Sequence, residues 1–273
     1  MNYLRPKSLD ECLGFLRSEG GNSPILLAGG TDLMPRYERG RALPGTLIDL
    51  KHIDELRGIT TADDSIRIGS MTTIQEIQDH GIIRESFTAL QESATDFAGA
   101  QIRHRGTIGG NIINASPAGD LLPPLYAFNA SLECQGVEGE RMVPLREFIR
   151  GPGQTRLKQG ELLIAVHLEL TNCHSRFIKI GLREAMAISV VNLAILRSDD
   201  TSDPDELIVA AGAVAPTVVV LNEFGSAYLA GNRDWDGLSG LIDKQIAPID
   251  DVRASASYRR KVLKNMIRDA LTW

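Results

Sequence analysis

Cysteine is scarce in this sequence, and the three that it contains, Cys12, Cys134 and Cys173, lie far apart. None belongs to a Cys-x-x-Cys pair, so the chain shows no ligand set for zinc or an iron–sulfur cluster and no disulfide framework. We interpret the three residues as buried or incidental thiols in a reducing compartment. The sequence therefore offers no metal-binding residue.

Long apolar runs and a surplus of basic residues are also lacking. No run reaches transmembrane length, and the N-terminal stretch MNYLRPKSLDEC lacks the basic-then-apolar pattern of a signal peptide. We therefore expect no membrane span and a cytoplasmic location. A formal net charge of −6 argues against a nucleic-acid partner, because no basic excess is left to neutralise phosphates. The 273 residues, 43% of them hydrophobic, suit one large or two ordinary globular domains.

Recognisable catalytic motifs are missing as well. The sequence shows no Ser/His/Asp grouping, and its five histidines are dispersed. It contains neither a Walker A loop nor a Rossmann Gly-x-Gly-x-x-Gly motif. We therefore predict no catalytic side chain, which suits a protein whose cofactor carries the chemistry.

Two glycine-rich segments stand out against these absences. The first glycine segment, Ala28-Gly-Gly-Thr-Asp32, directly follows a short apolar run that predicts a buried strand. The second glycine segment, Thr107-Ile-Gly-Gly-Asn111, lies within the small-residue stretch 101–122. Glycine allows close approach to the backbone, and consecutive exposed N–H groups form an anion-binding concavity. The second segment alone is equally consistent with a Gly-Asn hairpin turn, but the two together favour a dinucleotide pyrophosphate as ligand.

The apolar periodicity predicts a mixed α+β chain. We expect helices at 8–20, 87–97 and 120–128, a short helix capped by Thr73 and Glu76, and strands at 24–28, 46–50, 65–69, 131–135, 139–144 and 161–170. The two prolines at 123 and 124 fit a first helical turn. From about residue 172 we expect a separate domain, with strands at 176–180, 190–197, 207–215 and 218–221 followed by two helices.

The motifs LLAGGTDLMP and TIGGNIINASPAGDLLP resemble the flavin-binding subunits of the molybdenum hydroxylases, which include medium subunits of bacterial xanthine, nicotinate and carbon monoxide dehydrogenases. The resemblance continues through GELLIAV, FIKIGLREAMAIS, GAVAPT and APIDDVRASASYRRKVL. It implies an α+β chain with a two-subdomain FAD-binding fold of the vanillyl-alcohol oxidase/MurB (PCMH) type, followed by a small α+β C-terminal domain. The implied division is 1–171 for the FAD-binding domain, with subdomains of about 1–55 and 56–171, and 172–273 for the C-terminal domain.

The resemblance also implies which residues bind FAD. The first pyrophosphate segment matches Leu27, Ala28, Gly29, Gly30, Thr31 and Asp32, and the second matches Thr107, Gly110, Asn111, Ile113 and Asn114. Asp120 matches an adenosine-side ribose contact, Phe97 and Leu163 match apolar contacts of the flavin, and Lys179 matches a basic residue near the flavin ring. Other interpretations remain open: Asp120 as a helix cap, Phe97 and Leu163 as core residues, and Lys179 as a solvated strand charge.

The function implied by the resemblance is electron transfer inside a larger enzyme. A molybdopterin-binding large subunit would oxidise the substrate, and a small subunit with [2Fe–2S] clusters would pass single electrons to FAD on this chain. FAD would then reduce NAD or another acceptor. Two alternatives compete: a stand-alone FAD-dependent oxidoreductase of the same superfamily, and a non-catalytic nucleotide-binding module.

Overall fold

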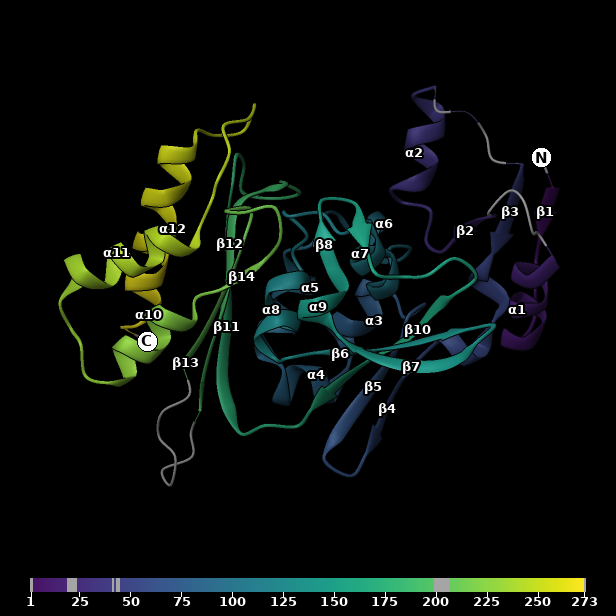
Figure 1. Cartoon of the computed structure of the whole chain (residues 1–273), viewed down its shortest axis with the longest axis horizontal. Helices are drawn as coiled ribbons and strands as arrows, with labels where there is room; N and C mark the ends of the chain where they lie inside the picture. Colours follow the sequence, from purple (N-terminus) through teal and green to yellow (C-terminus); the bar gives the residue numbers. More distant parts are fainter. Residues whose placement is uncertain (1, 19–23, 41, 43–44, 199–206, 273) are drawn as a thin grey trace.

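The structure is a computed structural model that describes residues 2–18, 24–40, 42, 45–198 and 207–272. Three larger sheets follow one another along the long axis of the molecule, from the N-terminal end on the right of Figure 1 to the C-terminal helices on the left. Helices fill the space between the second and third sheets and cover the outer face of the third. The fold is therefore mixed α+β, as the periodicity predicts.

The first sheet is parallel and has the strand order β1-β3-β2, with β1 at Asn2–Leu4, β2 at Ile25–Leu27 and β3 at Thr46–Asp49. The sequence analysis did not predict β1. Parallel strands end at a common edge, and the first glycine segment leaves this edge directly after β2. The helix α1 (Leu9–Ser18) connects β1 to β2; its predicted end at residue 20 lies outside the described residues.

The second sheet is antiparallel, with the order β4-β5-β10-β6-β7. Its strands are β4 (Ile59–Ala62), β5 (Ser65–Gly69), β6 (Ser131–Gly136), β7 (Gly139–Pro144) and β10 (Leu162–Glu169). The main hydrophobic core joins this sheet to α3 (Ile74–Asp79), α4 (Gly81–Ser86), α5 (Thr88–Thr95), α7 (Ile108–Asn114) and α8 (Leu122–Ala127).

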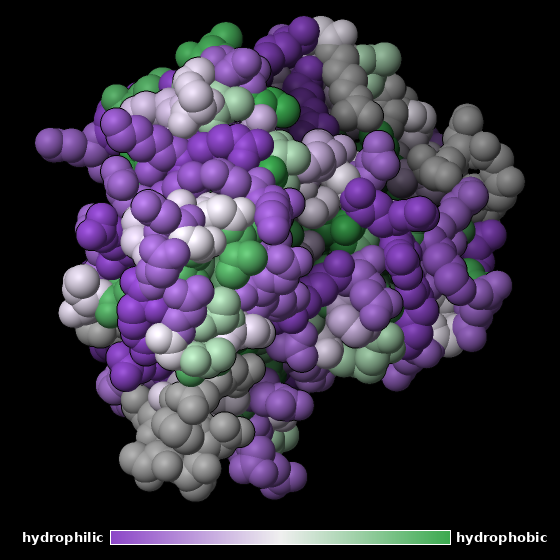
Figure 2. All heavy atoms as spheres, turned by 60° about the vertical axis from the view of Figure 1, so that its left-hand side comes forward, coloured by the Kyte–Doolittle hydropathy of each residue, from purple (hydrophilic) through white to green (hydrophobic). Residues whose placement is uncertain are grey.

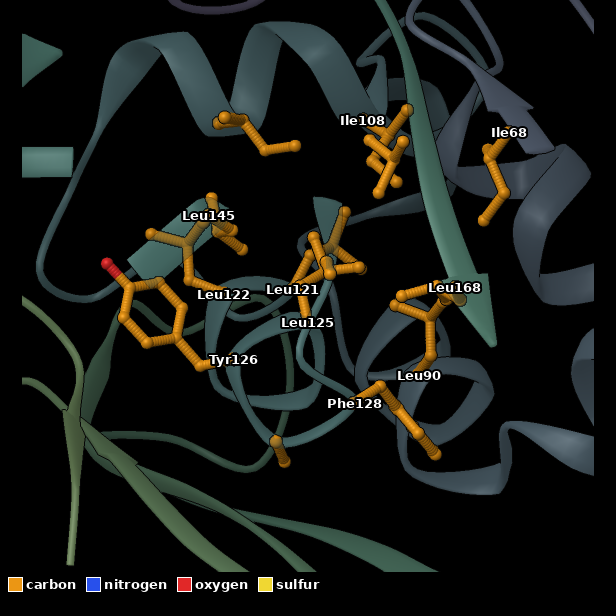
Figure 3. Packing of buried hydrophobic residues seen from close by; sticks show 14 of the residues in the cluster. Ile68, Leu90, Ile108, Leu121, Leu122, Leu125, Tyr126, Phe128, Leu145 and Leu168 are labelled. Atoms are coloured by element: carbon orange, nitrogen blue, oxygen red, sulfur yellow. The ribbon is translucent and has the colours of Figure 1, made fainter. Parts of the chain in front are cut away.

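Helix α8 lies at the centre of this core. Figure 3 shows Leu121, Leu122, Leu125 and Tyr126 packing toward Leu145, and all five side chains are at least 97% buried. The two prolines lie in the first turn of α8, where their missing N–H groups need no partner, as predicted. The capping box of Thr73 and Glu76 at the start of α3 is also confirmed.

The third sheet is antiparallel, with the order β11-β12-β13-β14. Its strands are β11 (Cys173–Gly181), β12 (Ser189–Ser198), β13 (Leu207–Gly212) and β14 (Val219–Val220). One face packs against α5 and α8, and the other packs against α10 (Asn222–Leu229) and α12 (Ala256–Ala270), with α11 (Trp235–Gln245) alongside.

The prediction of two terminal helices is wrong, because three follow β14 in the described residues. Helix α10 is short and contains Gly225, a poor helix former, in its middle. A Cβ at this position would lie 2.6 Å from the carbonyl oxygen of Leu207, so the glycine allows α10 to approach β13 closely. Tertiary packing thus stabilises a helix that local propensity does not indicate.

The remaining elements are short connections: α2 (Leu33–Glu38), α6 (Ala100–Arg103), α9 (Leu145–Phe148), β8 (Ile149–Gly151), β9 (Gln154–Thr155) and two 3₁₀ turns at Leu50–His52 and Asp54–Leu56. The face shown in Figure 2 is mostly hydrophilic, with apolar residues scattered in small groups. Within the described residues, no helix has the length and apolar character needed to cross a membrane.

Candidate cofactor site

The two glycine segments, far apart in the chain, lie against each other. A Cβ added to Gly29 would lie 1.9 Å from the carbonyl oxygen of Arg105, just before the second segment, so only glycine permits this contact. The guanidinium of Arg36 on α2 connects the first segment to the end of α7. Its Nη2 atom lies 2.6 Å from Asp32 Oδ2 and donates to Asn114 Oδ1 at 2.8 Å. The structure therefore brings together the two segments that the sequence predicts to share a ligand.

The first glycine segment presents free backbone donors. Gly30 has a φ of +75°, in the left-handed region that favours glycine, and its carbonyl accepts from the N–H of Met34 as α2 begins. Within the described residues, the N–H groups of Gly29, Gly30 and Thr31 donate to no protein acceptor. Neighbouring N–H groups of this kind, around a left-handed residue, form a nest for an anion.

The second glycine segment is different, because it forms the first turn of α7 instead of a loop. Thr107 is the N-cap, and its Oγ1 accepts from the N–H of Gly110 at 3.0 Å. The N–H of Ile108 donates to the carbonyl of Thr72, that of Gly109 to Ser70, and that of Asn111 to Thr107.

Four successive N–H groups of this segment thus already have acceptors in the protein. The expectation that they form an anion-binding concavity is wrong, and so is the alternative of a Gly-Asn hairpin turn. The physical reason is the contact with the segment 70–72, which the sequence places far away. Gly109 serves this contact, since its Cβ would lie 2.7 Å from the carbonyl oxygen of Ser70.

The second segment contributes side-chain atoms and space. The Oδ1 atom of Asn111 is buried and has no hydrogen-bond partner within the described residues. A buried amide oxygen without a partner is costly, and a ligand that donates to it removes that cost. Gly110 is half-buried, and its Cβ would lie 3.0 Å from Oγ1 of Thr107 and 3.9 Å from the Cβ of Ala28 on the first segment. Ile113 is half-buried and packs against the main core.

Asp120 is the centre of a buried polar group that we call the Asp120 cluster, made of Asp120, Lys179, Ser189 and Asn192. Lys179 Nζ lies 2.6 Å from Asp120 Oδ2, while Ser189 Oγ and Asn192 Nδ2 donate to Asp120 Oδ1 at 2.6 and 2.9 Å. The side chains of Asp120 and Lys179 are each only 8% exposed. A charge pair this deeply buried is maintained only with such compensating hydrogen bonds.

The contacts of the Asp120 cluster exclude two of the other interpretations, namely Asp120 as a helix cap and Lys179 as a solvated strand charge. Asp120 does not cap α8, because the N-cap of that helix is Leu121 and no side chain accepts from its first turn. Lys179 is not a solvated strand charge, because its ammonium group is buried against Asp120 and also donates to the carbonyl of Asp96 at 3.1 Å.

Ser189 and Asn192 were missed by the sequence analysis. Asn192 on β12 pairs laterally with Lys179 on β11 and with Gly212 on β13. A Cβ on Gly212 would lie 2.2 Å from Asn192 Oδ1, so the glycine makes room for the amide. Only the strand register brings these residues together, and no local sequence motif predicts that register.

Phe97 and Leu163 are both in contact with the main core. Leu163 lies on β10 beside a β-bulge and is 6% exposed, whereas Phe97 is half-buried at the end of α5. Phe97 directly follows Asp96, whose carbonyl accepts from Lys179, so it lies next to the Asp120 cluster. Core packing is thus established for both residues, and their contact with a flavin stays a prediction.

These features together define a class of protein. A nest of N–H groups without a protein acceptor among the described residues, at the carboxyl edge of a parallel sheet and beside a segment with an unpartnered buried amide oxygen, is suited to a phosphate-bearing cofactor. The glycines whose Cβ atoms would close the contact between the segments fit the same interpretation. The donor set therefore fits the pyrophosphate of a dinucleotide.

Comparison with known proteins gives the family. A family model described as the FAD binding domain in molybdopterin dehydrogenase matches residues 1–169, and one described as the CO dehydrogenase flavoprotein C-terminal domain matches residues 176–273. The xanthine dehydrogenase FAD-binding subunit of Escherichia coli O157:H7 is 32% identical over 280 residues, covering 99% of this chain and 94% of that protein. The glyceraldehyde dehydrogenase medium chain of Sulfolobus acidocaldarius is 27% identical over 266 residues, covering 96% and 94%.

A solved structure of carbon monoxide dehydrogenase from Hydrogenophaga pseudoflava, lacking the Mo-pyranopterin moiety of its molybdenum cofactor, superposes with a TM-score of 0.93 at 27% identity. The match covers 100% of this chain and 96% of the compared chain. The chain belongs to the family of FAD-binding medium subunits of the molybdopterin hydroxylases. This confirms the predicted resemblance and the predicted fold, an FAD-binding domain of the PCMH type followed by a flavoprotein C-terminal domain.

Proposed function

We propose that this chain holds FAD against its two glycine segments and passes electrons from the [2Fe–2S] clusters of a small subunit to NAD or another acceptor. The observation that carries the proposal is the set of N–H groups at Gly29, Gly30 and Thr31, which have no protein acceptor within the described residues and lie on a segment beside α7, whose first N–H groups are occupied. Bound FAD supplies the conversion between one-electron and two-electron transfer. The residues of this chain bind it, orient it and set its electrostatic surroundings.

The pyrophosphate binds, in this proposal, between the first glycine segment and the start of α7. Leu27 ends β2 and fixes the position of Ala28 to Asp32, whose backbone donors reach the phosphate oxygens. From the second segment, Thr107 caps α7, Gly110 leaves space, and Asn111 uses its unpartnered amide. Ile113 supports α7 from the core side, and Asn114 holds Arg36 beside Asp32.

The Asp120 cluster would contact one part of FAD and not two. The resemblance places Asp120 at the adenosine ribose and Lys179 at the flavin ring, but their side chains form a single ion pair of 2.6 Å. Since Lys179 also donates to the carbonyl that precedes Phe97, we assign the whole cluster to the flavin end, with Phe97 and Leu163 as apolar contacts. The ammonium of Lys179 and the carboxylate of Asp120 would together set the electrostatic surroundings of the flavin.

The domain division that we propose is 1–171, with subdomains of about 1–55 and 56–171, and 172–273. The two family matches end at 169 and begin at 176, and β11 begins at Cys173. The large partner that we propose is a molybdopterin-binding subunit that oxidises the substrate. In this proposal, that subunit, and not this chain, determines which substrate is oxidised.

Purification from the native source tests this function. We expect the chain to copurify with a molybdopterin-binding subunit and a [2Fe–2S] subunit, with about one FAD per chain. Rapid mixing with substrate should reduce the iron–sulfur clusters and the flavin in the complex, and leave the flavin of the isolated chain oxidised. Reduction of the isolated chain by a substrate of its own would instead establish a stand-alone oxidoreductase. A chain that takes up no FAD would be a nucleotide-binding module only.

A further inference from the structure

The C-terminal domain contains a buried arginine that contacts three separate parts of the chain. Arg259 on α12 is 1% exposed, and its Nη1 atom donates to the carbonyls of Val190 at 2.6 Å and Ala213 at 3.0 Å. Its Nη2 atom donates to Asp251 Oδ1 at 2.7 Å. Burial of an arginine is expensive unless its donors are paired. Nη1 and Nη2 of Arg259 are paired, whereas its buried Nε has no partner within the described residues.

Asp251 connects Arg259 to a second arginine. Arg253 donates to Asp251 Oδ2 through Nε at 3.0 Å and Nη2 at 2.6 Å, and its Nη1 atom donates to the carbonyl of Ser189 at 3.0 Å. These hydrogen bonds hold the pKa of Asp251 well below its usual range, so the carboxylate is ionised at any physiological pH. We call Asp251, Arg253 and Arg259 the arginine clamp.

One of the three carbonyls held by the arginine clamp belongs to Ser189, which also holds Asp120, and the other two belong to the next residue of β12 and to the end of β13. Arg253 fixes the carbonyl of Ser189, whose hydroxyl donates to Asp120, and Arg259 fixes the next carbonyl, at Val190. On the neighbouring strand end, Arg259 fixes Ala213, whose N–H donates to the carbonyl of Pro117 at 2.7 Å. Ala213 has a φ of +60°, an unfavourable conformation for a residue with a Cβ, so it needs such support.

We propose that the arginine clamp is a positioning device for the FAD site: Arg259 and Arg253 hold the ends of β12 and β13 so that Ser189 and Asn192 orient Asp120 and, through it, Lys179. This inference rests on the proposed FAD site. Among the described residues, neither Arg253 nor Arg259 hydrogen-bonds a side chain of the Asp120 cluster. Both act through the backbone carbonyls of Ser189, Val190 and Ala213. The C-terminal domain, on this view, sets the position of a charge pair that joins the two proposed domains, since Lys179 lies on β11 and Asp120 just before α8.

The direct test compares two adjacent arginines of α12 in the full-length chain. Arg259→Lys keeps the charge but loses the fork that binds two carbonyls and Asp251. Arg260→Met is the matched control, because Arg260 lies on the same helix and its Nη1 atom lies 3.3 Å from Asp243 Oδ1, away from the Asp120 cluster. The readouts are the FAD dissociation constant by fluorescence quenching and the visible absorption of the bound flavin, at a temperature where circular dichroism shows both variants folded.

Arg259→Lys should weaken FAD binding by about tenfold or more and shift the flavin absorption, as loss of a supporting residue does at other cofactor sites. Arg260→Met should change the dissociation constant by no more than about twofold. If Arg259→Lys does not fold, Arg253→Met replaces it, because that side chain is 26% exposed; we expect a smaller change in the same direction. Equal effects of Arg259→Lys and Arg260→Met, or none in Arg259→Lys, would overturn the inference.

A double-mutant cycle with Ser189→Ala tests the route of the effect. If Arg259 acts through Ser189, the effect of Arg259→Lys on the dissociation constant should fall to less than about threefold in the Ser189→Ala background. Full additivity would show that Arg259 acts only on general stability and would contradict the proposal. Failure of the wild-type chain to bind FAD would remove the proposed function itself, whereas normal wild-type binding with an unaffected Arg259→Lys variant would remove this inference alone.

Discussion

The two glycine segments have nearly the same composition but use it in opposite ways. Each has a Gly-Gly pair with a threonine and an Asp or Asn beside it. In the first, Gly30 takes a left-handed conformation and the backbone N–H groups stay free. In the second, the glycines open a helix and their N–H groups are occupied, with Gly109 packed against Ser70.

This difference teaches that a glycine pair shows where a backbone must approach something closely, but not what it approaches. Gly29 approaches the carbonyl of Arg105 and Gly109 that of Ser70, so both close contacts are with the protein. The segments differ in their N–H groups, for which we propose a ligand as acceptor in the first segment only. The proposed pyrophosphate site is therefore asymmetric, with backbone donors on one side and side-chain atoms and space on the other. Five substitutions test this asymmetry.

Gly29→Ala should have the largest effect, because its Cβ would lie 1.9 Å from the carbonyl oxygen of Arg105 and would force the segments apart. We expect FAD affinity to fall by about 100-fold or more, equivalent to about 2.7 kcal/mol. Fluorescence titration measures it. Gly14→Ala is the control, since nothing lies within 4 Å of its Cβ in α1, and it should leave binding unchanged. Normal FAD affinity in Gly29→Ala would show that contact between the segments is not needed.

Gly110→Val and Gly109→Ala separate ligand space from protein packing. Gly110→Val should abolish flavin retention while the fold stays largely intact, because the side chain enters the space beside Ala28. Gly109→Ala should instead lower thermal stability by about 1–3 kcal/mol through overpacking against Ser70. Flavin content after gel filtration and thermal melting of the FAD-free proteins distinguish them. The reverse pattern would exchange the roles of the two glycines.

Asn111→Leu should change stability and affinity in opposite directions. Without FAD, removing a buried amide oxygen that has no partner should raise stability by about 1 kcal/mol. With FAD, the lost hydrogen bond should weaken binding by about tenfold. Thermal melts with and without FAD measure both. A variant that is destabilised without FAD would show that Asn111 has a partner in the protein.

Arg36→Met should have the smallest effect. Arg36 bridges Asp32 and Asn114, but its side chain and that of Asp32 are about half exposed, and exposed pairs contribute about 0.2–1 kcal/mol. We expect the FAD dissociation constant to rise by about two- to threefold, less at high salt. A loss as large as that of Gly29→Ala would mean that Arg36 binds a phosphate directly.

Much of the fold could be predicted from the sequence, because many of its signals are local. The alternation at 65–69, the capping box at Thr73 and the prolines at the start of α8 each determine an element without help from distant residues. The short strand β1 could not be predicted. It has only three residues and is stabilised by pairing with β3, which follows much later in the chain.

The candidate site could be predicted in part for the same reason. The glycine segments are local motifs, and Asp120 and Lys179 were identified through the family resemblance. Their pairing, the support from Ser189 and Asn192, and the hydrogen bonds from Ile108 and Gly109 to the segment 70–72 all depend on strand register and tertiary contacts. The motif that contains Asp251 and Arg259 helped to indicate the family, but its contacts with β12 became visible only in three dimensions.

The third sheet contributes side chains to two hydrophobic cores, as the residues of β12 show. Ala194 and Leu196 point into the core of the FAD-binding domain, while Leu193 and Ile195, between and beside them, point into the core under α12. A deletion of one residue in this strand would exchange the two sets of side chains and damage both cores at once. The two parts that we propose to divide near residue 171 share this strand, so we expect them to unfold together and the chain to melt in a single transition.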